Sequence, residues 1–456
     1  MRLLHVGSGF RPWRHGGLVA YTEDLMDEQA ARGHDVRYAF AGRQYPWGLR
    51  PRLRRWRRRG VEMLEIVDSP LYDHGRQPGA ELGEPRVERL FRRVLREVRP
   101  DVVHVHELAG LPSSVLEIAH SEGAPVVMTL QDYFPLCPAF RLVDADGRVC
   151  TRREVGEDCL ATLAADPRRR ELLIEASLRH DVGDRRGIVR LARLGAALRR
   201  TERATAHAYQ RRREVNAERL GGVDLLLAMS HRVAELYAQL GVDPARLRTL
   251  HLTLAHVERL RPRPPRRAEP LTFATLAALE SETKGARVLL DAVRALGPGP
   301  YRVLVFGYVD PRFEAEARAL PQLELRGAFR PDELDAILDE VDVGLLPSIW
   351  EEAYGYVGIE LLAKGIPVVG NAIGGIVDYV RDGETGWLNR SCGAEELARI
   401  MGDLVAHPER VGQRSGAVLA ARERIVKPMA AHADEMDVLY AEVATAFPPA
   451  RDTSAA

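Results

Sequence analysis

Short runs of apolar residues recur along the chain, and most of them precede a segment in which apolar residues return every three or four positions. The first pattern predicts buried strands, and the second predicts helices with one apolar face. The predicted strands span 2–7, 36–40, 100–106, 125–130, 223–230, 271–276, 301–306, 323–327, 341–346, 367–370 and 383–388. The predicted helices span 18–32, 85–98, 166–213, 230–240, 331–338, 356–363 and 395–405, with more helix toward 446. This alternation predicts an α/β fold of doubly wound parallel sheets.

Two stretches depart from the alternation. Residues 42–84 carry no clear pattern, and they include a dense basic run, 49–60, around Trp56. A solvated arginine-rich loop is the simpler interpretation of this run, and contact with anionic lipid headgroups or an anionic ligand is the alternative. Within 166–213, one apolar stripe comprises Ile188, Leu191, Leu194 and Leu198. The stripe predicts core packing, or an insertion that shapes a binding site and touches a membrane.

A proline-rich linker, 261–270, divides the chain into two domains of ordinary size. We expect the first domain to span 1–260, with the helical insertion, and the second to span 270–425. Residues 426–447 predict a terminal helix, and 448–456 predict a frayed tail.

Composition narrows the function classes. The 65 basic and 65 acidic residues cancel, which argues against a dedicated nucleic-acid binder. Four cysteines in 456 residues indicate a reducing compartment. The chain opens directly into a strand, and no apolar run has the length of a membrane span. We therefore expect a cytoplasmic protein that is at most peripheral to a membrane.

Residues 347–378 contain the strongest candidates for ligand binding. The pattern there predicts the end of a strand, a loop, a helix and a second strand. Glu352 lies in the loop, and Glu360 lies further along the helix. Open parallel sheets bind ligands outside the carboxyl ends of their strands, and a helix start suits a phosphate. A carboxylate on the helix suits the two hydroxyls of a ribose, and one in the loop suits sugar hydroxyls. Gly374 and Gly375 then form a turn that a ligand can approach closely.

Glu352-x7-Glu360, the following Gly-Ile-Pro-Val-Val and Gly374-Gly375 resemble the donor-site motif of retaining glycosyltransferases of family 4. The resemblance implies the GT-B fold, in which two Rossmann-like domains face each other across a cleft. It also implies that Glu360 holds the ribose and that Glu352 holds the transferred sugar, close to the reaction. The terminal helix 426–447 would pack back on the first domain, as in relatives.

The resemblance supplies further donor-binding residues. Lys284-Gly285 matches the family, although Ala277-Ala278 stand where a Gly-Arg pair is usual. Lys284 would neutralise charge on the leaving diphosphate and is, with Glu352, our candidate catalytic residue. The remaining donor-binding candidates are Gly16, Gly17, Gly307, Tyr354 and Gly355.

The opening strand–loop–helix does not fit a dinucleotide-binding fingerprint. Pro12 stands where the third glycine belongs, and no acidic residue ends the second strand. The unit resembles the family opening instead, where a Gly-Gly pair approaches the donor diphosphate.

By the same resemblance, residues of the first domain border the cleft on the acceptor side. They are His104, His106, Gln131 and Asp132. Gln131 departs from the family, since many relatives carry His immediately before the Asp. The two histidines also allow a structural interpretation, because an imidazole on a strand is often hydrogen-bonded within the core.

Cys137, Cys150 and Cys159 follow in a loop that some relatives share. Three thiols are one ligand short of a structural zinc site, so free thiols are the simpler expectation and metal binding the alternative. Asp144 and Asp146 mimic the metal motif of another glycosyltransferase fold, but Gly147 after them predicts a hairpin turn.

The resemblance therefore predicts transfer of a hexose-type sugar, with retention, from a nucleoside-diphosphate sugar to a hydroxyl of a glycan, lipid-linked or small-molecule acceptor. It predicts no cofactor, no metal and no nucleic-acid partner, because Lys284 and helix dipoles balance the diphosphate charge. Two alternatives stay open. One is a GT-B nucleotide-sugar epimerase, and the other is a weakly active donor-binding scaffold, favoured by Gln131 and Ala278.

Overall fold

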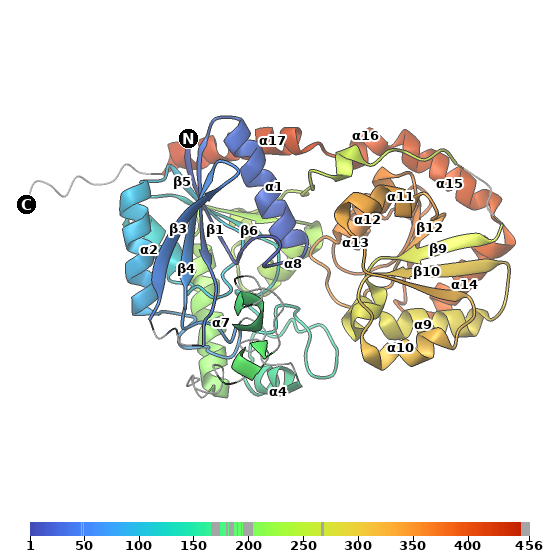
Figure 1. The fold of residues 1–456 in the computed structure, drawn as a ribbon, viewed down its shortest axis with the longest axis horizontal. Helices are drawn as coiled ribbons and strands as arrows, with labels where there is room; N and C mark the ends of the chain where they lie inside the picture. Colours follow the sequence, from blue (N-terminus) through green and yellow to red (C-terminus); the bar gives the residue numbers. More distant parts are fainter. Residues whose placement is uncertain are drawn as a thin grey trace, which may run out of the picture. The chain divides into compact units, whose positions relative to one another are not determined.

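The computed structural model describes residues 1–46, 48, 50–165, 174–178, 181, 187–188, 190–192, 194, 204–265 and 269–447. Its two units each contain one sheet (Figure 1). Unit 1 comprises Met1–Met229, Val233–Leu250 and Met429–Ala456, and unit 2 comprises Ser230–Arg232 and His251–Pro428. Both are α/β units whose sheets are parallel as predicted, apart from one antiparallel edge strand in unit 1.

The sheet of unit 1 has the strand order β3-β4-β2-β1-β5-β6-β7-β8. Every neighbouring pair is parallel except β3 and β4. The strands are β1 Arg2–Gly7, β2 Asp35–Ala41, β3 Arg52–Arg58, β4 Val61–Val67, β5 Val102–Val105, β6 Val126–Leu130, β7 Leu225–Ala228 and β8 Leu247–Thr249. The chain order reverses between β1 and β5, so this sheet has its switch point there.

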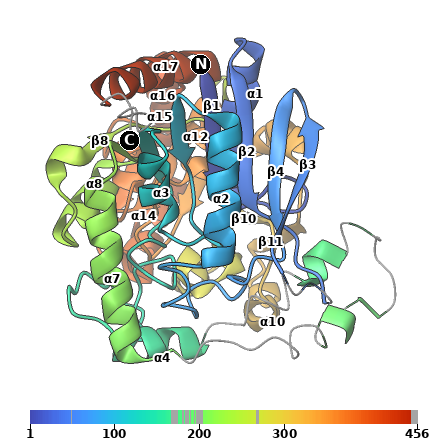
Figure 2. The same ribbon diagram turned by 90° about the vertical axis from the view of Figure 1, so that its left-hand side faces the viewer.

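Helices cover the strands of unit 1. They are α1 Gly17–Ala31, α2 Pro85–Val98, α3 Val115–Ser121, α4 Glu157–Ala165, α7 Ala206–Gly221, α8 His231–Gln239, which begins in unit 2, and α17 Met429–Ala446. Figure 2 shows α2 and α3 side by side. The last helix, α17, packs on α1, β5 and β6. Its hydrogen bonds to the rest of the unit include one between Tyr21 Oη and His432 Nε2 (2.8 Å) and one between Tyr440 Oη and His104 Nδ1 (2.6 Å).

The sheet of unit 2 is entirely parallel, with the order β11-β10-β9-β12-β13-β14. Its strands are β9 Leu271–Thr275, β10 Tyr301–Phe306, β11 Leu323–Gly327, β12 Val343–Leu346, β13 Val368–Asn371 and β14 Gly386–Asn389. Its α-helices are α9 Ala286–Leu296, α10 Pro311–Arg318, α11 Leu334–Leu338, α12 Tyr356–Ala363, α13 Ile376–Tyr379, α14 Ala394–Ala406, α15 Glu409–Ala420 and α16 Arg422–Ile425. Strand β9 starts one half of the sheet and β12 starts the other.

The core of unit 2 explains why these strands are nearly continuous apolar runs. Phe273, Val303 and Val343 on neighbouring strands are fully buried, and they pack with Leu289 of α9 and Met401 of α14. Both faces of a parallel sheet are covered, so polar alternation is absent. Burial of each such side chain stabilises the unit by about 1.5–3 kcal/mol.

The prediction that residues 42–84 have no regular structure is wrong, because β3 and β4 lie there. The basic run is an edge strand rather than a loop, and its charges hide the strand pattern. Arg52 pairs with Asp68, Arg55 with Glu97 and Arg58 with Glu23. Charged side chains on an edge strand discourage pairing with another chain. Leu49, at the start of the run, lies outside the described residues.

The insertion predicted over 166–213 is described only in part. Ile188 is buried in a small cluster with Tyr45 and Ile174, while Leu191 and Leu194 are exposed. Among the described residues, the members of the stripe are therefore not all buried on one face of a helix. Leu198, the linker residues 266–268 and the tail 448–456 lie outside them. Strand β8 and helices α3, α4, α9, α10 and α13 were not predicted. None of the helices in the described part of the chain has the length and apolarity to cross a membrane.

Candidate active site

The candidate site of unit 2 lies at the switch point of its sheet. The loop after β9 leads to Lys284, and the loop after β12 carries Glu352. Because β9 and β12 are parallel neighbours, their carboxyl ends meet at one edge. Residues 68 positions apart in sequence are therefore brought together.

Lys284 and Glu352 form an ion pair, with 2.6 Å between Nζ and Oε1. The Lys284 ammonium also lies 5.3 Å from the centroid of the Trp350 ring. Lys284 ends a short 3-10 turn, Glu282–Lys284, which Ser281 caps. Its side chain remains 31% exposed, so a ligand can reach the cation.

The backbone around Glu352 is held tightly. Its Oε1 also accepts a hydrogen bond from Ser348 Oγ (3.0 Å), and its carbonyl accepts one from Gly375 N (2.7 Å). A Cβ on Gly374 would lie 2.4 Å from Glu352 N, and one on Gly375 would lie 2.6 Å from Ala353 O. The Gly-Gly turn is thus required by the loop that presents Glu352.

Glu351 is a residue that the sequence did not single out. It is buried, and Arg232 donates to both of its carboxylate oxygens, with 2.6 Å from Nη2 to Oε1. Its Oε2 accepts from Gly374 N at 3.0 Å. Glu351 therefore ties the Gly-Gly turn to the loop before Glu352. It stands beside a motif residue without belonging to the motif, so no sequence signal separated it.

Glu360 lies on α12, as predicted, and its Oε1 accepts from His256 Nε2 at 2.7 Å. His256 comes from the loop before the 3-10 turn η2 Val257–Arg259, and no sequence signal had indicated it. The Glu360 side chain is 12% exposed.

Tyr354 and Gly355 lie just before α12. The Tyr354 ring stacks on His251, with centroids 5.4 Å apart, and burial raises the pKa of its phenol. Gly355 has φ 81°, and its carbonyl accepts from Tyr379 Oη at 3.0 Å. Gly307 follows β10 with φ 96°, and a Cβ there would lie 2.7 Å from Leu276 O.

Asp378, after the Gly-Gly turn, binds two histidines. His231 Nδ1 lies 3.0 Å and His251 Nε2 lies 2.9 Å from its Oδ2. Burial raises the pKa of Asp378, but the hydrogen bonds from His251 and His231 outweigh it, so the pKa lies below its ordinary value. The ligand atoms of these three residues lie within 4.8 Å of one another, as in a metal site, but the same atoms are joined by hydrogen bonds, and His231 N also donates to Asp378 Oδ2 at 2.9 Å.

In unit 1, Gly16 and Gly17 form the start of α1. Gly16 is the N-cap with φ 115°, a conformation that favours glycine, while a Cβ there would meet nothing within 4 Å. The free N–H groups of the following turn can bind an anion. The donor-diphosphate role of this pair stays a prediction.

His104 and His106 lie at the end of β5 and are fully buried together with His5 of β1. His104 bonds Tyr440 Oη and Thr129 Oγ1, and His106 Nε2 bonds His5 Nδ1 at 2.8 Å. Burial lowers the pKa of all three imidazoles, to about 4 for His5. All six ring nitrogens of this trio are hydrogen-bonded, so the trio is a polar core rather than an open metal site.

Gln131 continues this network at the end of β6. Its Nε2 lies 3.2 Å from His106 Nδ1, and its buried Oε1 has no hydrogen-bond partner within the described chain. Because His106 Nδ1 accepts from the amide, His106 donates through Nε2 to His5, which donates to Gln29 Oε1. Asp132 accepts from Phe134 N at 2.9 Å. The acceptor-side role of these residues stays a prediction.

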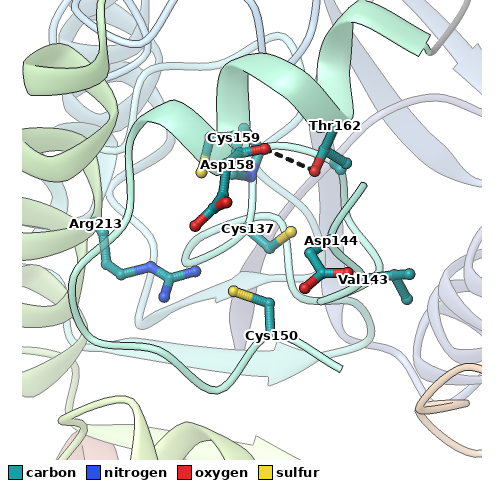
Figure 3. A pocket seen from close by; sticks show the side chains of 10 residues that line it. Cys137, Val143, Asp144, Cys150, Asp158, Cys159, Thr162 and Arg213 are labelled. Carbon is teal, nitrogen blue, oxygen red and sulfur yellow. Dashed lines mark hydrogen bonds between the residues drawn. The ribbon is translucent and has the colours of Figure 1, made fainter. Parts of the chain in front are cut away.

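Cys137, Cys150 and Cys159 line one small pocket, together with Asp144, Asp158 and Arg213 (Figure 3). All three thiols are free and buried, and burial raises the pKa of Cys137 and Cys159. They are not among the groups of described residues whose ligand atoms could share one ion. Gly147 N bonds Asp144 O at 3.1 Å, and residues 143 and 149 pair antiparallel, so the predicted hairpin turn is confirmed.

Two protein-family models match this chain, one on each side of the linker. The model of the glycosyl transferase 4-like domain matches residues 16–253, more than half of the chain. The model of glycosyl transferases group 1 matches residues 270–407, which include the whole Lys284–Glu352–Glu360 site. The two models together cover every strand of both sheets except β1.

Curated relatives match over part of their length. A D-inositol 3-phosphate glycosyltransferase of Corynebacterium aurimucosum is 35% identical over 113 residues, 25% of this chain and 26% of that protein. The amylovoran biosynthesis glycosyltransferase AmsK of Erwinia amylovora is 32% identical over 147 residues, 29% of this chain and 35% of that protein. The chain thus aligns with about a third or less of either relative.

Solved structures resemble the whole chain. Sucrose-phosphate synthase from Thermosynechococcus elongatus has a TM-score of 0.62 at 15% identity, covering 98% of this chain and 100% of that one. Anabaena HepE, solved with UDP and glucose, has a TM-score of 0.59 at 14% identity, covering 96% and 99%. At these identities the likeness concerns the fold, which is that of GT-B glycosyltransferases.

Proposed function

Since this chain belongs to the glycosyl transferase 4-like and group 1 family, we propose that it transfers a hexose-type sugar from a nucleoside-diphosphate sugar to an acceptor hydroxyl, with retention at the anomeric carbon. The relatives whose names give an activity support the class of reaction. The candidate acceptors are glycans, lipid-linked saccharides and small molecules that carry a hydroxyl.

The Lys284–Glu352 pair carries the proposal. It sets one cation and one carboxylate 2.6 Å apart at the switch point of a parallel sheet. A sugar diphosphate needs a cation for the diphosphate and an acceptor for the sugar hydroxyls. When the donor binds, its phosphates would take the place of Glu352 beside Lys284 and free the carboxylate for the sugar.

In the proposed reaction, the bond between the anomeric carbon and the diphosphate oxygen breaks, and the acceptor oxygen bonds to that carbon on the same face. The acceptor proton passes to the leaving diphosphate. Negative charge grows on that diphosphate in the transition state, so Lys284 stabilises the transition state more than the bound donor. Helix starts add partial positive charge, and the proposal needs no divalent ion.

A direct experiment tests the reaction class. The purified chain is screened by thermal shift against UDP-, GDP-, dTDP- and ADP-sugars, because a bound ligand stabilises the folded state. The stabilising donor is then incubated with an acceptor panel, and the product linkage is assigned by NMR. An α-linked product from an α-donor supports the proposal. Conversion of the donor without acceptor would favour an epimerase, and binding without turnover would favour a scaffold.

The basic edge strand offers a second partner for the same enzyme. Arg54 and Arg57 of β3 are exposed, and neither side chain has an ion pair or hydrogen bond among the described residues. They suit the headgroups of an anionic membrane, where each cation near the surface contributes about 1 kcal/mol. Cosedimentation with phosphatidylglycerol vesicles, compared with phosphatidylcholine vesicles, tests this contact.

A further inference from the structure

Glu360 and His256 form a hydrogen-bonded pair that joins α12 to the segment before the linker. His256 Nε2 lies 2.7 Å from Glu360 Oε1, and both side chains are mostly buried, at 24% and 12% exposed. We propose that His256 is a positioning residue that sets the Glu360 carboxylate for the ribose of the nucleotide. The proposal rests on the proposed function, in which Glu360 binds that ribose.

The imidazole comes from a rigid part of the chain. Val257, next to His256, is fully buried, and its N–H bonds Leu254 O at 3.0 Å. The His256 carbonyl accepts from Arg259 N at 3.1 Å, which closes the 3-10 turn. A hydrogen-bond donor on a fixed turn holds the Glu360 side chain in one rotamer. The conformational entropy of that side chain is then lost on folding, so ligand binding does not have to pay it.

The pair leaves capacity for a ligand on the same carboxylate. Glu360 Oε2 has no hydrogen-bond partner in the described part of the chain, and Oε1 accepts only from His256. A carboxylate has about four lone-pair sites on its two oxygens. The vicinal hydroxyls of a ribose can therefore bind Oε2 and the second site of Oε1 while the imidazole stays in place.

Docking of this segment on α12 does not depend on His256. Arg422 Nε donates to Ala363 O at the end of α12 (2.8 Å), and its Nη2 donates to Leu260 O (3.0 Å). Arg263 N also bonds Lys364 O at 2.8 Å. Loss of the imidazole should consequently leave the segment on the helix and affect chiefly the Glu360 carboxylate.

The test compares two ligands that differ only in the ribose hydroxyls. Binding of UDP and of 2′,3′-dideoxyuridine diphosphate is measured by calorimetry, with the guanosine or adenosine pair used if the parent prefers that base. The parent should prefer the ribose form by about 10–100-fold, the strength of hydrogen bonds to a charged group. His256→Leu should reduce this preference about 3–10-fold, and His256→Gln, which keeps a donor at the Nε2 position, should recover most of it.

A matched control breaks a similar pair elsewhere. His120 Nε2 bonds Asp224 Oδ2 at 2.6 Å in unit 1, and His120→Leu should leave the ribose preference unchanged. A preference in His256→Leu equal to the parent's, or a loss that is the same for both ligands, would overturn the inference and leave the proposed function standing. Failure of the parent to bind any nucleoside diphosphate would overturn both.

Discussion

The carbonyl oxygen of Pro347 occupies the space that a side chain on Gly285 would need, since a Cβ at Gly285 would lie 2.0 Å from it. Gly285 also has φ 90°, which disfavours any residue with a Cβ. The loop after β9 and the loop after β12 can therefore touch only through glycine. This contact places Lys284, one residue earlier, beside Glu352.

Gly285→Ala should accordingly lower both stability and donor binding by more than the unfavourable φ of the alanine alone would. The matched control is Gly383→Ala, at φ 83° with no atom within 4 Å of the new Cβ. The control should lose about 1–2 kcal/mol of the free energy of unfolding from the left-handed backbone. Gly285→Ala should lose about 1–3 kcal/mol more from overpacking.

Urea unfolding and donor binding are measured for both variants. Gly383→Ala should bind the nucleoside diphosphate like the parent, whereas Gly285→Ala should bind it more weakly because the two loops must separate. Equal losses of stability and unchanged donor affinity in the two variants would show that the loops have room to move.

Lys284→Ala should reduce turnover by roughly 10²–10³-fold, as does removal of one preorganised charge-stabilising donor. The family's Arg is replaced by Ala278, so Lys284 is the cation that the matched motif supplies. Lys284→Arg should keep part of the rate, because it retains charge but not shape. Arg318→Ala, which removes an exposed cation of α10 paired with Glu314, is the control and should behave like the parent. Rates are measured at saturating donor, and near-parental turnover of Lys284→Ala would assign the role to another cation.

The sequence predicted those elements whose apolar residues form a clear pattern and missed those whose pattern is hidden by charged residues. Helix α12 and strand β10 have the bounds that their apolar patterns predicted, since burial on both faces leaves little ambiguity. Strand β3 was missed because five of its seven residues are arginine, which obscures the alternation of an edge strand. It forms an antiparallel ladder with β4 and its arginines form ion pairs with Asp68, Glu97 and Glu23, and no local pattern reports such contacts.

The site shows the same contrast. Glu352 and Glu360 were predicted from their spacing along one loop and helix, and Lys284 from a separate Lys-Gly match, because both patterns are local information. Glu351 and His256 were not found, since their importance lies in partners 119 and 104 positions away, Arg232 and Glu360. Such contacts are fixed by the order of strands in the sheet and not by neighbouring residues.

Activity should survive removal of divalent ions. Lys284 and the helix starts supply positive charge for the diphosphate, so turnover after treatment with EDTA and gel filtration should equal that of untreated protein. Loss of turnover that magnesium or manganese restores would assign a metal to the diphosphate. Loss that only zinc restores would direct attention to Cys137, Cys150 and Cys159, whose pocket is shown in Figure 3.

The buried histidines of unit 1 should make it sensitive to mild acid. Burial holds the pKa of His5 at about 4 and lowers the pKa of His104 and His106, against about 6.5 in an unfolded chain. Between these values the unfolded state binds protons that the folded state excludes. The stability that these neutral imidazoles contribute is thus fully present above pH 6.5 and is lost as the pH falls toward 4.

His5 should lower the free energy of unfolding by up to about 1.4 kcal/mol per pH unit in this window, and His104 and His106 should act in the same direction. Hydrogen exchange at pH 7.5 and 5.5, corrected for intrinsic rates, measures the effect in peptides of β1 and β5. Peptides of β9 and β12 are the internal control, because His231, His251, His256 and His407 of unit 2 all keep part of their rings exposed. Protection in β1 and β5 should fall at pH 5.5 while that in β9 and β12 changes little. An equal fall in both units would mean that acid acts through carboxylates shared by the whole chain and not through the histidine core.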